Sequence, residues 1–191
     1  MRTKLLFLLF FIYYSSMLEA QNQYNNYKND YIWMLGYVSP NPDSLFGGAI
    51  IDFHNYPTKA YRKNVLIKIG QSFVSYCDNK GNLILTSNGR EITDSTLNIM
   101  DNGAGLEVGL TGYKGNAGNQ ATLVLDWPND TNKLAVIYSD TYYEEYKYVC
   151  SYNLFYSVID KKGNNGLGKV IEKNNKVFSH TLSPSHLTAC R

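Results

Sequence analysis

VCSYNLFYSVID (Val149–Asp160) is followed by KKGNNGLG and then by KVIEKNNKVF (Lys169–Phe178). The two outer runs are rich in aromatic and β-branched residues, which favour strands. The run between them is rich in glycine and asparagine, which reverse the direction of the chain. The stretch therefore predicts two strands that pair with each other.

Two further pairs of runs show the same pattern. Ser72–Cys77 and Leu83–Ser87 flank the turn sequence DNKGN, and Ala121–Leu125 and Leu134–Tyr138 flank DWPNDTN, whose proline ends a strand. Other strands are expected at Tyr31–Val38, Gly48–Phe53 and Val65–Ile69. No window outside the first twenty residues has sustained helical periodicity, so the predicted fold class is all-β.

Residues 88–120 differ from the rest, because they carry seven glycines and few core-forming residues. We expect a long irregular loop here. Such a loop inside a compact domain is uncommon and often faces a ligand. The alternative is a surface loop whose glycines only allow positive φ angles, and the sequence leaves both open.

One pattern occurs twice in the chain. FVSYCDNKGN (Phe73–Asn82) and FYSVIDKKGN (Phe155–Asn164) share six residue types at the same offsets and begin at positions 73 and 155. Each copy is predicted to be a strand that runs into a turn led by aspartate. A propeller blade takes ~40–50 residues, so the separation fits two blades. The alternative is that a strand followed by an aspartate turn is a common local pattern.

The N-terminus has the three parts of a secretory signal peptide. Arg2 and Lys4 precede the apolar run Leu5–Tyr14, and small residues lead to Ala20. The run is shorter than the ~20 apolar residues that span a membrane. We expect residues 1–20 to be a signal peptide, residues 21–30 a polar segment, and the product to be secreted or at the cell surface, with no transmembrane anchor after cleavage.

Charge offers no indication of a nucleic-acid partner. The net charge of the whole chain is +2, and residues 1–20 hold two basic residues and one acidic residue. The mature chain is therefore close to neutral, whereas a nucleic-acid-binding domain carries a clustered basic face.

Motifs for cofactors and nucleophiles are absent from the sequence. Gly103, Gly105 and Gly109 miss the dinucleotide-binding spacing by one residue. Lys80 stands where a calcium loop needs a ligand oxygen, so Asp78–Asn82 is predicted to be a turn. There is no G-x-S-x-G nucleophile motif. No cofactor is predicted.

The three histidines are interpreted as ordinary polar residues. Asp52 and His54 lie two apart on a predicted strand and so share a face, where the carboxylate could orient the imidazole. No third ligand follows from the sequence. His180 and His186 fit no metal spacing. We therefore predict no catalytic residue and no metal ligand.

The cysteines and tyrosines are interpreted mainly as core residues. Cys77, Cys150 and Cys190 allow at most one disulfide, and their pairing stays open. The aromatic run Asp140–Tyr156 fits a strand with one face in the core; a stacking platform for sugars or peptides is the alternative. Asn129 begins an N-glycosylation triplet, a pattern that also occurs by chance.

Several short motifs, in this order, resemble the N-terminal region of large secreted proteins of gliding, type IX-secreting bacteria. In that family a propeller-like domain precedes adhesive repeats and a C-terminal sorting or gliding-motility-associated domain. The motifs are WMLGY (Trp33–Tyr37), FGGAIIDF (Phe46–Phe53), CDNKGNLILTSNG (Cys77–Gly89), IMDNGAGL (Ile99–Leu106), LFYSVID (Leu154–Asp160), NNGLGKVIEKN (Asn164–Asn174) and HLTACR (His186–Arg191).

The resemblance implies that residues 31–191 are the opening blades of a β-propeller-like domain that is incomplete at the C-terminus. It implies an exported, non-enzymatic binding or scaffold module with an extracellular glycan or protein as ligand. One alternative is part of a propeller-type carbohydrate-active enzyme, which would need two carboxylates ~5–10 Å apart among residues such as Asp52, Glu107 and Asp140. Another is a nonfunctional truncated product.

Overall fold

The computed structural model describes residues 27–36, 48–63, 65–109, 115–144, 148–183 and 187–189. These residues form twelve β-strands and one short 3₁₀ turn at Asn164–Gly166. The prediction of an all-β fold is confirmed. The predicted signal peptide lies outside the described residues.

Three strands form a small antiparallel sheet in the order β1 (Ile32–Gly36), β2 (Gly48–Asp52) and β3 (Lys59–Lys63). The main sheet has the order β4-β5-β6-β7-β12-β11-β9-β8, and β10 pairs with β11 beside this path. Its strands are β4 (Val74–Cys77), β5 (Leu83–Ser87), β6 (Glu91–Thr93), β7 (Ile99–Ala104), β8 (Thr122–Asp126), β9 (Lys133–Ser139), β10 (Tyr142–Glu144), β11 (Tyr148–Asp160) and β12 (Lys169–Leu182).

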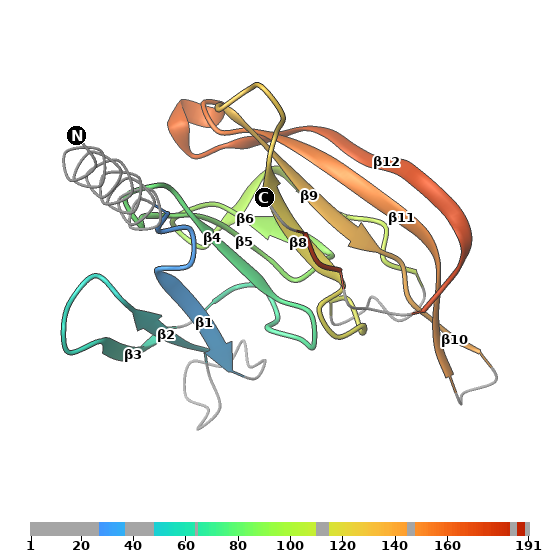
Figure 1. Ribbon diagram of the computed structural model, residues 1–191, viewed down its shortest axis with the longest axis horizontal. Helices are drawn as coiled ribbons and strands as arrows, with labels where there is room; N and C mark the ends of the chain where they lie inside the picture. The colour runs from blue at the N-terminus through green and yellow to red at the C-terminus, as the bar shows by residue number, and fades with distance from the viewer. Residues whose placement is uncertain are drawn as a thin grey trace, which may run out of the picture.

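The main sheet curls into a nearly closed, barrel-like shape (Figure 1). Its two edge strands, β4 and β8, approach each other, and the Tyr76 hydroxyl donates a hydrogen bond of 2.5 Å to Asp126 Oδ1 across the gap. On the opposite side, β7 and β12 run parallel, and Lys169 lies beside Asp101. Their side chains form an ion pair of 3.0 Å.

The prediction of propeller blades is wrong. A propeller blade is a separate four-stranded sheet that radiates from a central channel. Here the three predicted hairpins lie in one continuous sheet, because the parallel contact between β7 and β12 joins the N-terminal and C-terminal halves. The two copies of the strand and aspartate turn are both present, at β4 and β11, but they are local features of this single sheet.

The hairpins β4–β5, β8–β9 and β11–β12 confirm the three predicted pairs. The strand predicted at Val65–Ile69 is wrong, because these residues have no strand conformation, although Ile67 and Ile69 are buried. The sequence reading also missed β3, whose five residues are all exposed. Without a buried face, a strand shows no alternation of apolar and polar residues.

The long loop predicted over residues 88–120 is wrong in part, because it contains β6 and β7. Two residues of β7, Asn102 and Gly103, are uncommon in strands, so the sequence pattern did not indicate a strand here. Asn102 has a φ of 59°, and Gly103 lies so close to Ile92 that a Cβ would stand 2.6 Å from the Ile92 carbonyl oxygen. Glycine is therefore required where the two strands approach.

Two hydrophobic cores hold the fold. The larger fills the interior of the barrel-like sheet and contains Tyr76, Leu85, Ile92, Met100, Leu106, Val124, Leu134, Val136, Tyr138, Phe155, Ile159 and Val170. The smaller lies between the three-stranded sheet and the outer side of β4, and contains Ile32, Met34, Ile50, Cys77 and Leu97. Neighbours Tyr76 and Cys77 thus serve different cores, as alternation along a strand requires.

Hydrogen bonds fix the small sheet to β4. The Cys77 N–H donates to the Asn29 carbonyl at 3.0 Å, and Asn29 Nδ2 donates to the Cys77 carbonyl at 2.7 Å. The Ser75 hydroxyl donates to the Ile32 carbonyl at 2.6 Å. The sheet is therefore attached along β1, while β2 and β3 extend away from the barrel-like sheet (Figure 1).

Candidate functional site

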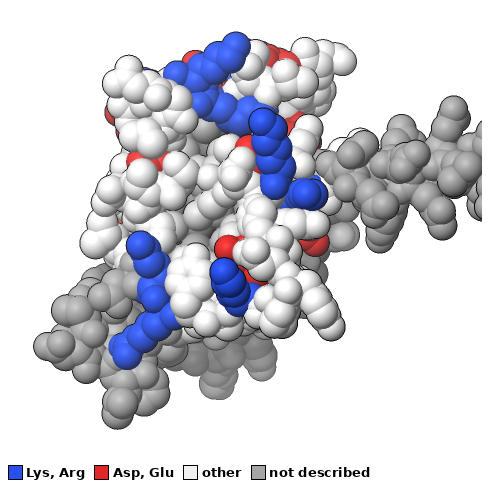
Figure 2. Space-filling model, turned by 90° about the vertical axis from the view of Figure 1, so that its left-hand side faces the viewer, with Lys and Arg blue, Asp and Glu red and all other residues white. Residues whose placement is uncertain are grey.

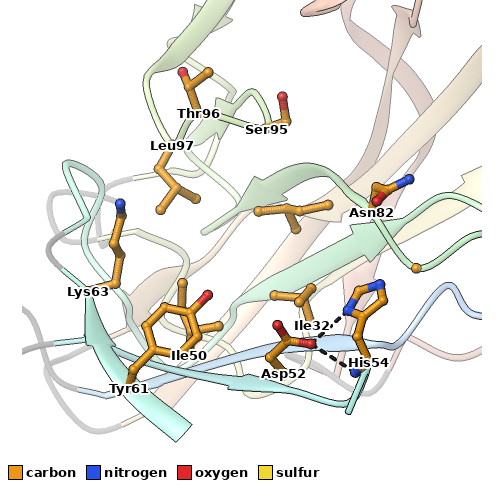
Figure 3. A pocket seen from close by; sticks show the side chains of 12 residues that line it. Ile32, Ile50, Asp52, His54, Tyr61, Lys63, Asn82, Ser95, Thr96 and Leu97 are labelled. Atoms are coloured by element: carbon orange, nitrogen blue, oxygen red, sulfur yellow. Dashed lines mark hydrogen bonds and ion pairs between the residues drawn. The ribbon is translucent and has the colours of Figure 1, made fainter. Parts of the chain in front are cut away.

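A cleft of about 530 Å³ lies between the three-stranded sheet and two turns of the main sheet (Figure 3). Strands β1 to β3 form one wall. The turn before β5 and the turn between β6 and β7 form the other. The lining residues are Ile32, Ile50, Asp52, His54, Tyr61, Lys63, Gly81, Asn82, Leu83, Ser95, Thr96 and Leu97.

The floor of the cleft is apolar and belongs to the smaller core. Ile32, Ile50 and Leu97 are 5–9% exposed, and Leu83 packs against them. The same side chains thus stabilise the attachment of the small sheet and offer a surface to an apolar group in the cleft.

Asp52 and His54 form a hydrogen-bonded pair at one end of the cleft. Asp52 Oδ1 lies 2.7 Å from His54 Nδ1 and also accepts the His54 backbone N–H at 2.9 Å. These two bonds hold the pKa of the Asp52 carboxyl below its ordinary value. The sequence placed both residues on one face of a strand; in the structure Asp52 ends β2 and His54 follows it.

The turn before β5 brings Gly81 against the imidazole of His54. Gly81 has a φ of +92°, and a Cβ there would stand 2.7 Å from His54 Nε2. Asp78 holds the turn, because its carboxylate accepts the backbone N–H groups of Lys80 and Asn82 and the side-chain amide of Asn82. Burial opposes ionisation of Asp78, but the hydrogen bonds from Asn82, Lys80 and Gly81 together outweigh it and lower its pKa. The prediction of a turn at Asp78–Asn82 is confirmed.

A second aspartate turn presents Ser95 and Thr96 to the cleft. Asp94 Oδ1 accepts the Thr96 backbone N–H at 2.8 Å and the Thr96 hydroxyl at 2.6 Å. Leu97 then adopts a φ of 69°, which directs its side chain into the smaller core while the two hydroxyl residues before it stay exposed. In both turns the aspartate carboxylate accepts hydrogen bonds from residues of the same turn, so neither turn needs a ligand to keep its conformation.

Sequence reasoning missed most of the polar residues that line the cleft. Among the described residues, no hydrogen bond is made by the side chains of Tyr61, Lys63 or Ser95. They come from β3 and from a turn within the region predicted to be a loop. A D-x-T pattern at residues 94–96 could have indicated the aspartate turn, but no sequence pattern brings it opposite β3.

The structure does not gather the other candidate carboxylates with Asp52. Asp140 is fully buried and accepts hydrogen bonds from the backbone N–H groups of Tyr152 and Asn153 and from Asn153 Nδ2. Glu107 is exposed. The residues that follow Glu107 and Asp140 are hydrogen-bonded to each other, because the Thr141 N–H donates to the Val108 carbonyl at 2.9 Å. Glu107 follows β7 and Asp140 follows β9, neither lines the cleft, and Asp140 has a structural role.

The remaining candidates lie away from the cleft. His180 is exposed on β12, where its ring centroid is 6.2 Å from that of Phe178, and His186 lies outside the described residues. The glycosylation triplet begins at Asn129, which is exposed in the turn between β8 and β9. In the aromatic run, Phe155 is buried in the larger core, whereas Tyr143 is 57% exposed.

Cys77 is a buried core residue, as the sequence predicted, and burial raises the pKa of its thiol to about 11. Cys150 is half-buried, and its Sγ donates to the Tyr142 carbonyl at 3.6 Å. Cys77 and Cys150, the two described cysteines, form no disulfide with each other. Cys190 lies outside the described residues. Within the part of the chain that the structure describes, no three His, Cys, Asp or Glu side chains gather as a metal site. No helix in that part is long and apolar enough to cross a membrane.

The chain matches no protein-family model, and no curated protein or solved structure is significantly similar to it. The resemblance to secreted proteins of gliding bacteria therefore stays a prediction.

Proposed function

We propose that this chain is an exported binding module and that the cleft beneath the three-stranded sheet is its ligand site. The observation that carries the proposal is the combination of an apolar floor with polar side chains that have no partner among the described residues, namely Tyr61, Lys63 and Ser95. Ligand sites are typically concave and apolar, with a few polar groups that fix orientation. Export is proposed from the signal-peptide pattern of residues 1–20.

The geometry favours binding over catalysis. Asp52 orients the imidazole of His54 as a general base requires, but Nε2 lies against Gly81. Ser95 and Thr96, which carry hydroxyl groups, lie on the opposite wall (Figure 3). A base has to be within ~2.6–3.2 Å of the proton that it removes. The hydroxyls across the cleft therefore suit ligand recognition better than nucleophilic attack.

The test blocks the cleft without changing the core. Ser95 is exposed at the rim, so Ser95→Trp fills the cleft from outside. Thr131→Trp is the matched control, because Thr131 is exposed in the turn between β8 and β9, outside the cleft lining. The labelled chain and both variants are incubated with arrays of short peptides and of glycans.

We expect the unmodified chain and Thr131→Trp to bind the same array members and Ser95→Trp to lose them. Equal binding by all three proteins would place the ligand elsewhere and contradict the proposed site. Absence of binding to either array by the unmodified chain would contradict the binding function for these two ligand classes.

A further inference from the structure

We propose that the cleft and the free edge of β3 together form a docking site for an extended acidic peptide segment, which adds to β3 as a fourth strand. The inference rests on the proposed function and names the class of its ligand. It follows from three properties of β3: its place in the sheet, its charge and its position over the cleft.

β3 ends the small sheet. It pairs with β2 over all five residues, and no described strand pairs with its other side. All five of its residues are exposed. An edge strand presents backbone N–H and C=O groups that a second extended chain can pair with, and this strand addition is a common mode of peptide recognition.

The charge of β3 selects the partner. Lys59, Arg62 and Lys63 make up three of its five residues, and none is acidic. Figure 2 views the molecule from the side on which β2 and β3 lie in Figure 1, and blue Lys and Arg side chains cover more of this face than red Asp and Glu side chains. Asp52, which lies opposite Lys59 in the sheet register, is already bonded to His54.

A second copy of this chain is a poor occupant of the edge. Pairing of two β3 strands would bring Lys and Arg side chains of one copy against those of the other, and like charges across a strand pair are destabilising. Lysine at a sheet edge also guards against self-association. An acidic strand, by contrast, would place its carboxylates beside these cations.

The cleft sets the pattern of the peptide. Tyr61 and Lys63, two residues apart on β3, both line the cleft, so this face of the strand points inward. A strand added beside β3 would direct every second side chain to the same side as Tyr61 and Lys63. Lys59 also lies on this side of β3, so the favoured ligand places acidic side chains there, beside Lys59 and Lys63, and alternates them with β-branched residues on the other side.

The probe is a blocked heptapeptide in which valine and glutamate alternate. Two control peptides change one property each: lysine replaces glutamate in the first, and proline replaces alternate valines in the second, which removes backbone donors but keeps the charge. Binding to the full chain is measured by fluorescence polarisation, and amide hydrogen exchange reports on β3.

We expect the acidic peptide to bind and to slow exchange of the β3 amides, and each control peptide to bind at least about tenfold more weakly. Lys63→Glu should weaken binding by a similar factor. Lys162→Glu, the same charge change at an exposed residue of the turn after β11, should leave it unchanged.

Equal binding of the proline peptide would overturn strand addition. Equal binding of a short oligonucleotide would show that the site recognises negative charge alone, which also contradicts the proposal. If the acidic peptide fails to bind while an array ligand is lost in Ser95→Trp, the cleft is a ligand site of another class. If no array ligand depends on Ser95, the proposed function fails as well.

Discussion

The interior of the barrel-like sheet and the cleft under the small sheet both combine apolar with polar side chains. They differ in whether the tyrosine side chain in each has a hydrogen-bond partner. In the barrel interior the Tyr138 hydroxyl lies 2.6 Å from Asn174 Oδ1 and 3.0 Å from Ser157 Oγ. In the cleft the side chains of Tyr61 and Lys63 have no such partner among the described residues. The Tyr138 hydroxyl thus stabilises the closed core, whereas the polar groups of Tyr61 and Lys63 remain available to a ligand.

The largest expected effect comes from a cavity in each core. Leu134 is fully buried in the larger core, and Leu134→Ala should lower the free energy of unfolding by about 3–5 kcal/mol. Ile50→Ala removes a side chain at the floor of the open cleft, where neighbours and water can adjust, and should cost about 2 kcal/mol. Urea unfolding measures both; equal losses would show that the smaller core is as closed as the larger.

The two tyrosines give a more direct comparison. Tyr138→Phe removes the hydrogen bonds of this hydroxyl to Asn174 Oδ1 and Ser157 Oγ and should cost about 1–3 kcal/mol. Tyr61→Phe removes a hydroxyl that faces the cleft and should change stability by less than about 0.5 kcal/mol. A thermal or urea unfolding series measures the pair. A large loss in Tyr61→Phe would mean that this hydroxyl has a structural partner.

Acid should weaken the turn that forms one wall of the cleft. The pKa of Asp78 is below its ordinary value of 3.8 in the folded chain, so its stabilising contribution is present above that value and is lost as the pH falls through the folded pKa. Asp78→Asn should cost about 1 kcal/mol at neutral pH, because the turn is mostly solvated. The difference between the two proteins should narrow as the pH falls, and a constant difference would contradict this origin.

The smallest effect is expected at the parallel contact between β7 and β12. Lys169 Nζ and Asp101 Oδ2 form an ion pair of 3.0 Å whose side chains are both nearly half exposed. Asp101→Asn should therefore change the free energy of unfolding by less than about 1 kcal/mol, and added salt should remove the difference. A loss that persists in high salt would indicate that the ion pair holds the two halves of the sheet together.

Local sequence patterns predicted the parts of the fold that local physics determines. The hairpins and the aspartate turns at Asp78 and Asp160 follow from strand propensity and turn chemistry within a few residues. The repeated strand and turn suggested a propeller, but the same local pattern also fits one continuous sheet. Which sheet a hairpin joins depends on contacts between distant segments, such as Lys169 beside Asp101.

The site was less predictable than the fold. Asp52 and His54 were visible as a pair because they are close in sequence. Tyr61 and Lys63 lie on a strand with no buried face. Ser95 lies in a turn between β6 and β7, two short strands that were not predicted because the region is rich in glycine. Their approach across the cleft depends on the attachment of β1 to β4 through Asn29, which no sequence pattern indicates.

A nuclear magnetic resonance titration of the isotope-labelled chain with the strongest binder from the arrays would locate the ligand site residue by residue. If the cleft is the ligand site, the largest amide shifts will occur at β3 and at residues 95–97, and the amides of β9 and β11 around the larger core will stay unchanged. Shifts concentrated on β9, β11 or β12, with β3 and residues 95–97 unaffected, would contradict the account.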